Sequence, residues 1–313
     1  MKTVKAVPPY IHPEQLNFKT APYEAWMKLG GEVAPAHYPP RLLHGFAFHY
    51  EIPTLWKSKK EARIRFVEPI SITFDTFPDY ALYDIIPFVW DCWPCYFERM
   101  CRWLKKHHVR TAIFTSSQTA ERMRKRFPEM NILSITEGID TIRYNKGEEL
   151  NHRIIKVYEI GSVQRSYFKK KYPNEYRALH NAPSEWDLAT GEGFKKYLEN
   201  TQLTIIFPRS VTEPETAQGI ETLTQRYWEC MLSRIVMVGH APKELTDLLG
   251  YNPVIELDRN CELSHINHIL QEIENPKYQE LVDRNREIAL QYASWEIRMT
   301  RIMSWLKELG YNI

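Results

Sequence analysis

The sequence predicts an α/β protein built from two Rossmann-like domains, each with a mostly parallel sheet. The first observation is length, because 313 residues exceed one ordinary core and suit two. The second is the alternation of short apolar runs with segments of helical spacing, which is typical of βαβ units. The third is a polar stretch at 140–151, after which the alternation starts again. Two successive halves of about 150 residues are therefore expected.

The individual elements follow from local patterns. Residues 1–70 are rich in proline and aromatic side chains and give no assignment. In the first half we expect strands at 85–90, 111–115 and 131–135, and helices at 96–107 and 117–126. In the second half we expect strands at 154–160, 203–207, 235–238 and 254–257. The helices expected there cover 169–172, 193–199, 222–231, 243–249 and 263–309, the last with a break at Asn275-Pro276.

Composition sets the class of protein. Hydrophobic residues make up 43% and charged residues 26%, as in soluble globular proteins. The first residues lack the apolar core of a signal peptide, and no run approaches the roughly 18 apolar residues that span a bilayer. Five cysteines without framework spacing fit a reducing compartment. We expect a cytoplasmic protein.

The net charge of +2 is unevenly distributed. Residues 1–150 carry 21 basic and 17 acidic side chains, hence +4, and the remainder carries 20 and 22, hence −2. The basic excess lies in Lys105, Lys106, Arg110, Arg122, Arg124, Lys125 and Arg126. These residues form either the solvated faces of two helices or a patch for a phosphate-bearing acceptor or an anionic membrane surface.

Polar residues follow several expected strands, at the edge where open parallel sheets bind ligands. They include Asp91, Ser116-Ser117, Gly161-Ser162, Pro208-Arg209-Ser210 and Gly239-His240. Two such edges facing each other across a cleft would suit an enzyme with two substrates.

The most informative segment begins with the strand end at Phe207 and contains two glutamates eight residues apart. This spacing places Glu221 at the start of a helix and Glu229 two turns further along nearly the same face. The helix start offers unpaired N–H groups to a diphosphate, and the second carboxylate can accept hydrogen bonds from ribose hydroxyls. Arg226 can pair with Glu229 or reach a phosphate. Two glutamates at this spacing also occur by chance on surface helices.

The order of motifs here resembles the group 1 glycosyltransferases of the GT-B superfamily. The Arg-x-x-Glu of Arg226 and Glu229 looks most like the branch of spore-maturation glycosyltransferases. Ser294-Trp295 stands where the family's last helix crosses back to the first domain. The motifs that carry the resemblance are Glu137-Gly138-Ile139-Asp140, Val157–Gly161, Pro208-Arg209-Ser210, Glu221-x7-Glu229, Ile235–Gly239 and His240–Leu245.

This resemblance implies a GT-B fold, in which two Rossmann-like domains face each other across a cleft. It places an N-terminal acceptor-binding domain at 1–145, a C-terminal nucleotide-sugar-binding domain at 152–292, and a helix returning to the first domain at 293–313. The donor-binding residues it implies are Gly161, Arg165, Lys170, Arg209, Ser210, Thr222, Leu223, Thr224, Arg226 and Glu229.

The sequence departs from the family pattern at three places. The family's Gly-Arg is replaced by Gly161-Ser162, and Arg165 and Lys170 keep the basic spacing slightly later. Thr224 stands at the usual glycine position three residues after the first glutamate. The segment 211–219 looks like an insertion, so Glu213 or Glu215 can compete with Glu221 for the role of first glutamate.

The catalytic candidates are Asp91 and Glu221. Asp91 follows a strand where relatives often carry His-Asp, although Trp90 occupies the histidine position. Its carboxylate can deprotonate or orient an acceptor hydroxyl, or it can serve only as a helix cap. His44 and His49 are alternative cleft residues.

Other motifs carry less weight. Cys92-Trp93-Pro94-Cys95 has redox spacing, but no second pair of cysteines could complete a zinc site. His265 and His268 share a helix face without a convincing further ligand. No Asp-x-Asp occurs in the chain, which favours a metal-independent reaction in which basic side chains neutralise the leaving diphosphate.

We therefore expect an enzyme that moves a hexosyl or pentosyl group from a nucleotide-diphosphate sugar, its co-substrate, to a hydroxyl acceptor. The resemblance implies retention of configuration and an acceptor that is a glycan, a lipid-linked sugar or another glycoconjugate. Peripheral contact with the inner membrane face through the basic N-terminal domain fits this interpretation. The alternatives are a glycosyltransferase that modifies DNA bases, against which the modest basic excess argues, and a non-catalytic nucleotide-sugar-binding protein.

Overall fold

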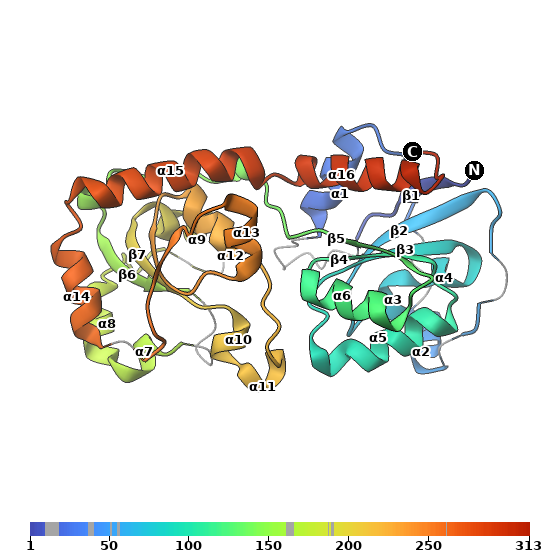
Figure 1. The fold of residues 1–313 in the computed structure, drawn as a ribbon, viewed down its shortest axis with the longest axis horizontal. Helices are drawn as coiled ribbons and strands as arrows, with labels where there is room; N and C mark the ends of the chain where they lie inside the picture. The colour runs from blue at the N-terminus through green and yellow to red at the C-terminus, as the bar shows by residue number, and fades with distance from the viewer. Residues whose placement is uncertain are drawn as a thin grey trace. The chain divides into compact units, whose positions relative to one another are not determined.

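The chain divides into two compact units in a computed structural model. The structure describes residues 1–9, 19–36, 41–50, 52–54, 57–160, 166–186, 188, 191–260 and 262–313. Unit 1 joins Met1–Thr136 with Trp295–Ile313, and unit 2 is Glu137–Ser294. Among the described residues, unit 1 has a five-stranded and unit 2 a four-stranded parallel sheet (Figure 1).

Unit 1 is a three-layer sandwich of helices, sheet and helices. Its parallel strands lie in chain order as β1 (Thr3–Ala6), β2 (Glu61–Val67), β3 (Asp84–Val89), β4 (Thr111–Phe114) and β5 (Asn131–Ser134). Its helices are α1 (Thr20–Lys28), α2 (Arg41–Tyr50), α3 (Ile72–Thr76), α4 (Asp79–Leu82), α5 (Pro94–Lys106), α6 (Ser117–Arg126) and α16 (Trp295–Glu308).

The two faces of this sheet are covered by different helices because successive strand residues point to opposite sides. On β3, Ile86 and Phe88 face a core completed by α1 and α16. Ile85 and Val89 face a second core completed by α3, α4, α5 and α6. Figure 1 shows α1 and α16 side by side over their face of the sheet.

The segments that follow β1 in the chain pair on opposite sides of it. The chain leaves β1, passes through α1 and pairs Val33 with Ala6 on the outer side of β1, before β2 pairs on the inner side. This arrangement creates a topological switch point at the carboxyl ends of β1 and β2, where open α/β sheets bind ligands.

Unit 2 repeats the three-layer plan with four parallel strands in chain order. These are β6 (Ile155–Glu159), β7 (Thr201–Ile206), β8 (Val236–Gly239) and β9 (Val254–Glu256). Its α-helices are α7 (Phe168–Lys171), α8 (Pro173–Leu179), α9 (Gly191–Glu199), α10 (Arg209–Thr212), α11 (Pro214–Ala217), α12 (Gln225–Leu232), α13 (Lys243–Leu249), α14 (Leu263–Gln271) and α15 (Pro276–Tyr292). The 3-10 turns η1 (Thr141–Arg143) and η2 (Leu150–His152) precede β6.

The core of unit 2 is also divided by its sheet. Helices α9, α12 and α13 pack on one face, with Trp228 fully buried among them. Helices α7, α8, α14 and the first part of α15 pack on the other face, around Val157 and Val238.

The segment 137–145, which the sequence placed in the first domain, belongs to unit 2. Trp228 Nε1 donates to the Glu137 carbonyl at 3.0 Å, and the Tyr144 hydroxyl donates to Glu229 at 3.1 Å. Asn145 adds a bond to Glu199 at 2.8 Å. The boundary falls at 136/137 because these side chains find their partners on α9 and α12. Helix α16, at 295–308, belongs to unit 1.

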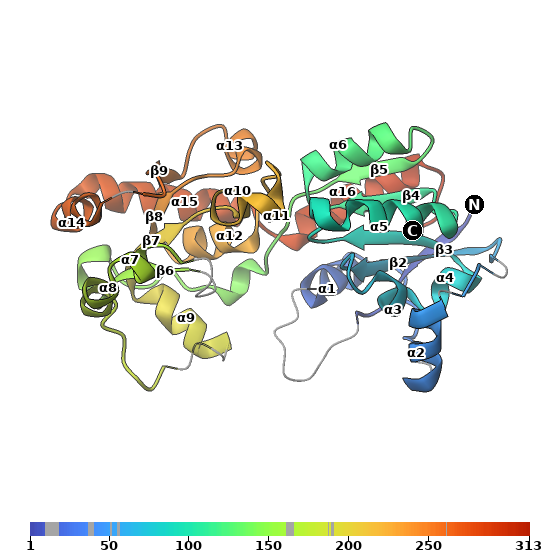
Figure 2. The ribbon, with the colours of Figure 1, turned by 90° about the horizontal axis from the view of Figure 1, so that it is seen from below.

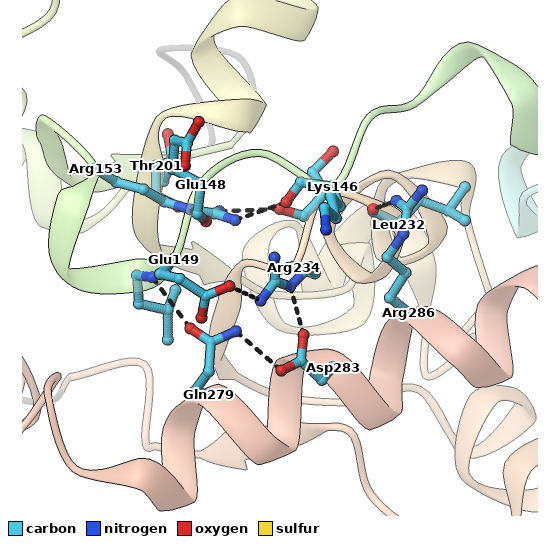
Figure 3. Close-up of polar contacts among 12 residues, drawn as sticks. Lys146, Glu148, Glu149, Arg153, Thr201, Leu232, Arg234, Gln279, Asp283 and Arg286 are labelled. Atoms are coloured by element: carbon cyan, nitrogen blue, oxygen red, sulfur yellow. Dashed lines mark hydrogen bonds and ion pairs between the residues drawn. The ribbon is translucent and has the colours of Figure 1, made fainter.

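Three arginines hold the start of unit 2 together at the amino ends of its strands (Figure 3). Arg153 is only 3% exposed, and its guanidinium donates to four carbonyl oxygens rather than to a carboxylate. These are the carbonyls of Lys146 (2.8 Å), Glu148 (2.9 Å), Thr201 (2.8 Å) and Ser233 (2.9 Å). Burial, with the nearby charge of Arg234, lowers the pKa of Arg153 to about 10.

The other two arginines tie α15 to the same segment. Arg234 pairs with Glu149 at 2.8 Å and with Asp283 of α15 at 2.5 Å. Arg286 of α15 donates to the carbonyl of Leu232 at the end of α12. Figure 3 shows these side chains converging between α15 and residues 146–153, so this part of unit 2 is a structural clamp.

Candidate functional site

The carboxyl ends of β7, β8 and β9 bring together groups from distant parts of the chain. β7 ends at Ile206 and leads into Pro208 and α10, while β8 ends at Gly239 and leads into His240. Gly239 has φ +138°, and a Cβ there would lie 1.9 Å from the Ile206 carbonyl oxygen. Only glycine allows this approach, which fixes His240 beside the end of β7 through a bond from its N–H to Ile206 O at 3.1 Å.

A polar cluster forms at this edge from Glu221, His240, Glu256 and Ser210. His240 Nδ1 lies 2.8 Å from Glu256, and its Nε2 lies 3.3 Å from Glu221. The Ser210 hydroxyl donates to the same Glu221 oxygen at 3.1 Å. Burial works against the imidazolium, but the bond to Glu256 and the charges of both glutamates outweigh it and raise the pKa of His240. A protonated imidazole held between two carboxylates donates one N–H to each, so His240 can donate to an anionic ligand only where the ligand takes the place of one carboxylate.

Glu221 is the glutamate that the structure brings into this cluster. Glu213, one of its two possible competitors, forms an ion pair with Arg209 one turn earlier. Glu215, the other, is exposed on α11. Arg209 and Ser210 therefore both lie at the sheet edge, each next to a carboxylate.

The amino end of α12 differs from the prediction. The helix begins at Gln225 rather than Thr222, because residues 221–224 run as an irregular segment with Thr224 at the N-cap position. Two backbone N–H groups at this end are already bonded to carboxylates: Leu223 N donates to Glu244 at 2.8 Å, and Gln225 N donates to Glu137 at 3.1 Å. The expectation that both are unpaired is wrong, since residues far apart in the sequence supply their acceptors.

Glu229 lies one turn into α12, where its side chain is half-buried beside Tyr144. One carboxylate oxygen accepts from the Tyr144 hydroxyl at 3.1 Å. The other, Oε2, is buried and has no hydrogen-bond partner among the residues that the structure describes. Burial raises the pKa of Glu229, opposed by the charge of Arg226 and the Tyr144 bond. Arg226 itself is exposed on the preceding turn.

The basic residues expected near the first strand of unit 2 are only partly described. Gly161 and Arg165 lie outside the described residues, whereas Lys170 is exposed on α7. The turn before Lys170 holds an anion of its own, because the buried carboxylate of Glu159 accepts from the N–H groups of residues 167, 168 and 169 at 2.7–3.1 Å.

Asp91 occupies the carboxyl end of β3 in unit 1. It is exposed and has φ +48°, a left-handed conformation that aspartate tolerates better than most residues. Its carbonyl accepts from Trp93 N at 2.8 Å in the turn that starts α5. Trp90, at the family's histidine position, is buried in the core.

The remaining candidates do not assemble into sites. Burial raises the pKa of Cys92, which keeps its thiol protonated and unreactive, while Cys95 is exposed. His265 and His268 are exposed on α14. His49 is exposed on α2, and the His44 side chain lies outside the described part. Within the described ranges, no three His, Cys, Asp or Glu residues are arranged to hold a metal ion, and no helix is long and apolar enough to cross a bilayer.

Sequence reasoning assigned no role to His240 and missed Glu256. The signal was present, since both stand at the ends of expected strands and such ends meet at one edge of a parallel sheet.

No protein-family model matches the chain, and no curated protein sequence does. Solved structures do match. HepE from Anabaena, in complex with UDP and glucose, aligns with a TM-score of 0.58 at 9% identity over 98% of this chain and 100% of its own. The fold is that of the GT-B glycosyltransferases.

Two further GT-B structures agree with this assignment. AviGT4, a glycosyltransferase involved in avilamycin A biosynthesis, aligns with a TM-score of 0.53 at 11% identity over 99% of this chain and 98% of its own. TarM gives 0.53 at 12% identity over 85% of this chain, which spans only 57% of TarM. These GT-B neighbours do not single out the spore-maturation branch, which stays a prediction.

Proposed function

We propose that this protein transfers a sugar from a nucleotide-diphosphate donor to a hydroxyl acceptor. The observation that carries the proposal is the cluster of Glu221, His240 and Ser210 at the carboxyl ends of β7 and β8. It lies at the edge where open parallel sheets bind ligands, in a fold whose neighbour HepE was solved with UDP and with UDP-glucose.

In this proposal unit 2 binds the donor. Glu229 accepts a hydrogen bond from a ribose hydroxyl. Its buried Oε2 has no partner among the described residues to hold it in place, so the carboxylate can turn toward the ligand. The diphosphate approaches the segment Thr222–Thr224, next to Arg209 and Ser210. Arg226, Arg165 and Lys170 supply positive charge to the diphosphate. They neutralise more of its charge than the backbone does, because Leu223 N and Gln225 N already have acceptors.

The chemical step breaks the bond between the anomeric carbon and the diphosphate oxygen, which keeps the electron pair. The acceptor oxygen bonds to that carbon and loses its proton. We assign Glu221 to the reacting sugar and Asp91 to the acceptor hydroxyl, whose proton it takes up or directs. His240 can donate its Nε2–H to the departing diphosphate when that group replaces Glu221 as the acceptor. We further propose retention of configuration, no metal requirement, and an acceptor in polysaccharide or glycoconjugate synthesis.

Nucleotide binding tests the donor site directly. Uridine, guanosine and adenosine diphosphates and their sugar derivatives should be screened for a rise in melting temperature. A ligand at 100 times its Kd stabilises the folded state by about 2.7 kcal/mol. Release of nucleotide from an activated sugar, even by slow hydrolysis, would separate an enzyme from a binding protein. If no nucleotide shifts the melting temperature and none is released, the proposal is wrong.

Glu229→Ala tests the ribose contact, because it removes both acceptor oxygens. Losing a hydrogen bond to a charged acceptor should weaken binding of the preferred nucleoside diphosphate by about tenfold or more. The variant should also bind the 2′,3′-dideoxy nucleotide as well as the ribonucleotide, whereas the natural protein should prefer the ribonucleotide. Glu280→Ala on the exposed side of α15 is the matched control. A ribose preference that survives in Glu229→Ala would refute the assignment.

A further inference from the structure

Helix α2 presents an apolar face to solvent. Leu42 is 88% exposed, Leu43 51%, Phe46 54% and Tyr50 64%. At 100° per residue these four side chains fall within one arc of about 100° along the helix. The rings of Phe46 and Tyr50 touch, with centroids 4.6 Å apart, so the stripe is continuous. Contiguous exposed apolar surface of this kind marks a binding surface for a protein or a membrane.

A basic hollow adjoins this helix. It has a volume of about 910 Å³ and lies between His49 of α2 and the outer side of α5. The cations that line it are Arg99, Arg102, Lys105 and Lys106, with His108 at its end. Arg99, Arg102 and Lys106 are spaced i, i+3, i+7 and so share one side of α5. Arg99, Arg102 and Lys105 form no ion pair with any described residue.

Each observation restricts the occupant. The cationic hollow favours a negatively charged occupant. The apolar stripe favours an occupant that can bury leucine, phenylalanine and tyrosine side chains together. Phenylalanine, tyrosine and arginine suit a protein interface as well as a membrane surface, but protein interfaces are depleted in lysine, and the hollow has two lysines. The combination of an amphipathic helix with neighbouring lysine and arginine is typical of binding to anionic lipid. Phe46 and the leucines can enter the boundary of the acyl chains while the cations of α5 stay at the level of the phosphates.

We propose that α2 and the α5 hollow together form a docking surface for an anionic lipid membrane. Figure 2 shows α2 standing out from unit 1 beside α3 and α4. The apolar stripe of α2 is exposed to solvent and therefore open to a membrane surface. The proposal does not depend on sugar transfer, since both features belong to unit 1, whereas the nucleotide contacts are assigned to unit 2.

Vesicle flotation of the full chain tests it. The probes are vesicles of phosphatidylcholine alone and of phosphatidylcholine with about 30% phosphatidylglycerol, at about 0.1 M and about 0.5 M salt. The chain should float with the anionic vesicles at low salt, less at high salt, and not with neutral vesicles. Arg99→Gln/Arg102→Gln should lose about 30-fold in affinity, since each cation near such a surface contributes about fivefold. Leu42→Ser/Phe46→Ser should also weaken binding.

Matched controls remove equal charge and equal exposed apolar surface elsewhere. Lys277→Gln/Lys307→Gln deletes two exposed cations, and Ile142→Ser/Leu290→Ser deletes two apolar side chains that are 88% and 46% exposed. All variants should keep the melting temperature of the natural protein because the altered residues are exposed. Flotation in which the α2 and α5 variants equal these controls would assign the contact to another surface. Absence of flotation with anionic vesicles would overturn the proposal and favour an acidic protein partner for α2.

Discussion

Replacing Arg153 with methionine should destabilise unit 2 severely. The apolar stem of the side chain is kept, but the carbonyls of Lys146, Glu148, Thr201 and Ser233 lose their donor. An unsatisfied buried group costs about 1–3 kcal/mol, so four such groups give about 4–12 kcal/mol before relaxation. Removing a buried cation that has no carboxylate partner offsets part of this cost. We expect a net loss of about 3–5 kcal/mol, a large share of a typical stability of about 5–15 kcal/mol.

Hydrogen exchange measured segment by segment is the suitable assay, because unfolding of two units need not be a single two-state transition. Amides of β7 and β8 should exchange faster in Arg153→Met, while those of β2 and β3 in unit 1 provide an internal reference. Arg143→Met is the matched control: this arginine lies in the same segment, is exposed and pairs with Asp140. A loss of unfolding free energy below about 1 kcal/mol, or an equal acceleration of amide exchange in both units, would refute the role of Arg153 as a structural clamp.

Two further substitutions probe the sheet edge. Gly239→Ala should destabilise unit 2 by about 2 kcal/mol or more, measured by denaturant midpoint, because the new Cβ meets Ile206 O at a positive φ; an unchanged midpoint would contradict this geometry. His240→Gln should lower the melting temperature most at acidic pH. Glu256 and Glu221 raise the pKa of His240 in the folded state, so the protonated imidazole stabilises the fold below its pKa in the unfolded chain, which is about 6.5. This contribution disappears as the pH rises through the folded-state pKa. A melting-temperature difference that is flat between pH 5 and pH 9 would contradict the pairing.

The sequence predicts most strands of both units because buried parallel strands read as short apolar runs. The expected strand at 111–115 is β4 (Thr111–Phe114), and that at 254–257 is β9 (Val254–Glu256). β2 was not predicted in this way because it carries Arg63 and Arg65, which are buried in the middle of the sheet. Arg63 is accommodated by Glu61 at 2.6 Å, and Arg65 by Asp79 at 3.4 Å. No apolar periodicity reveals a strand whose buried positions are charged and paired.

The site is less predictable because its parts are joined by topology. Glu221, His240 and Glu256 follow or end different strands in the sequence. They come into contact only because β7 pairs with β8 and β8 pairs with β9. The predicted start of α12 at Thr222 was wrong for a related reason. Thr222 and Thr224 are both suitable N-cap residues, and nothing local shows which one the helix uses.

The carboxylates at the start of α12 allow a last prediction that separates two positions for the donor diphosphate. Glu137 accepts from Gln225 N, so its charge offsets the positive end of the helix. Glu137→Gln keeps an acceptor oxygen and removes the charge. If the diphosphate lies at this helix end, the variant should bind nucleoside diphosphate more tightly by about two- to thirtyfold, and nucleoside less so.

Calorimetric titration of the nucleoside, the monophosphate and the diphosphate measures this dependence on ligand charge. Glu280→Gln serves as the control, because it removes one negative charge from an exposed position on α15. An affinity gain that grows with phosphate number places the anion beside Gln225. Equal affinities in Glu137→Gln and the control would instead place the phosphates near Lys170 of α7, since only a charge close to the ligand changes its affinity when surface charges are screened over about 10 Å.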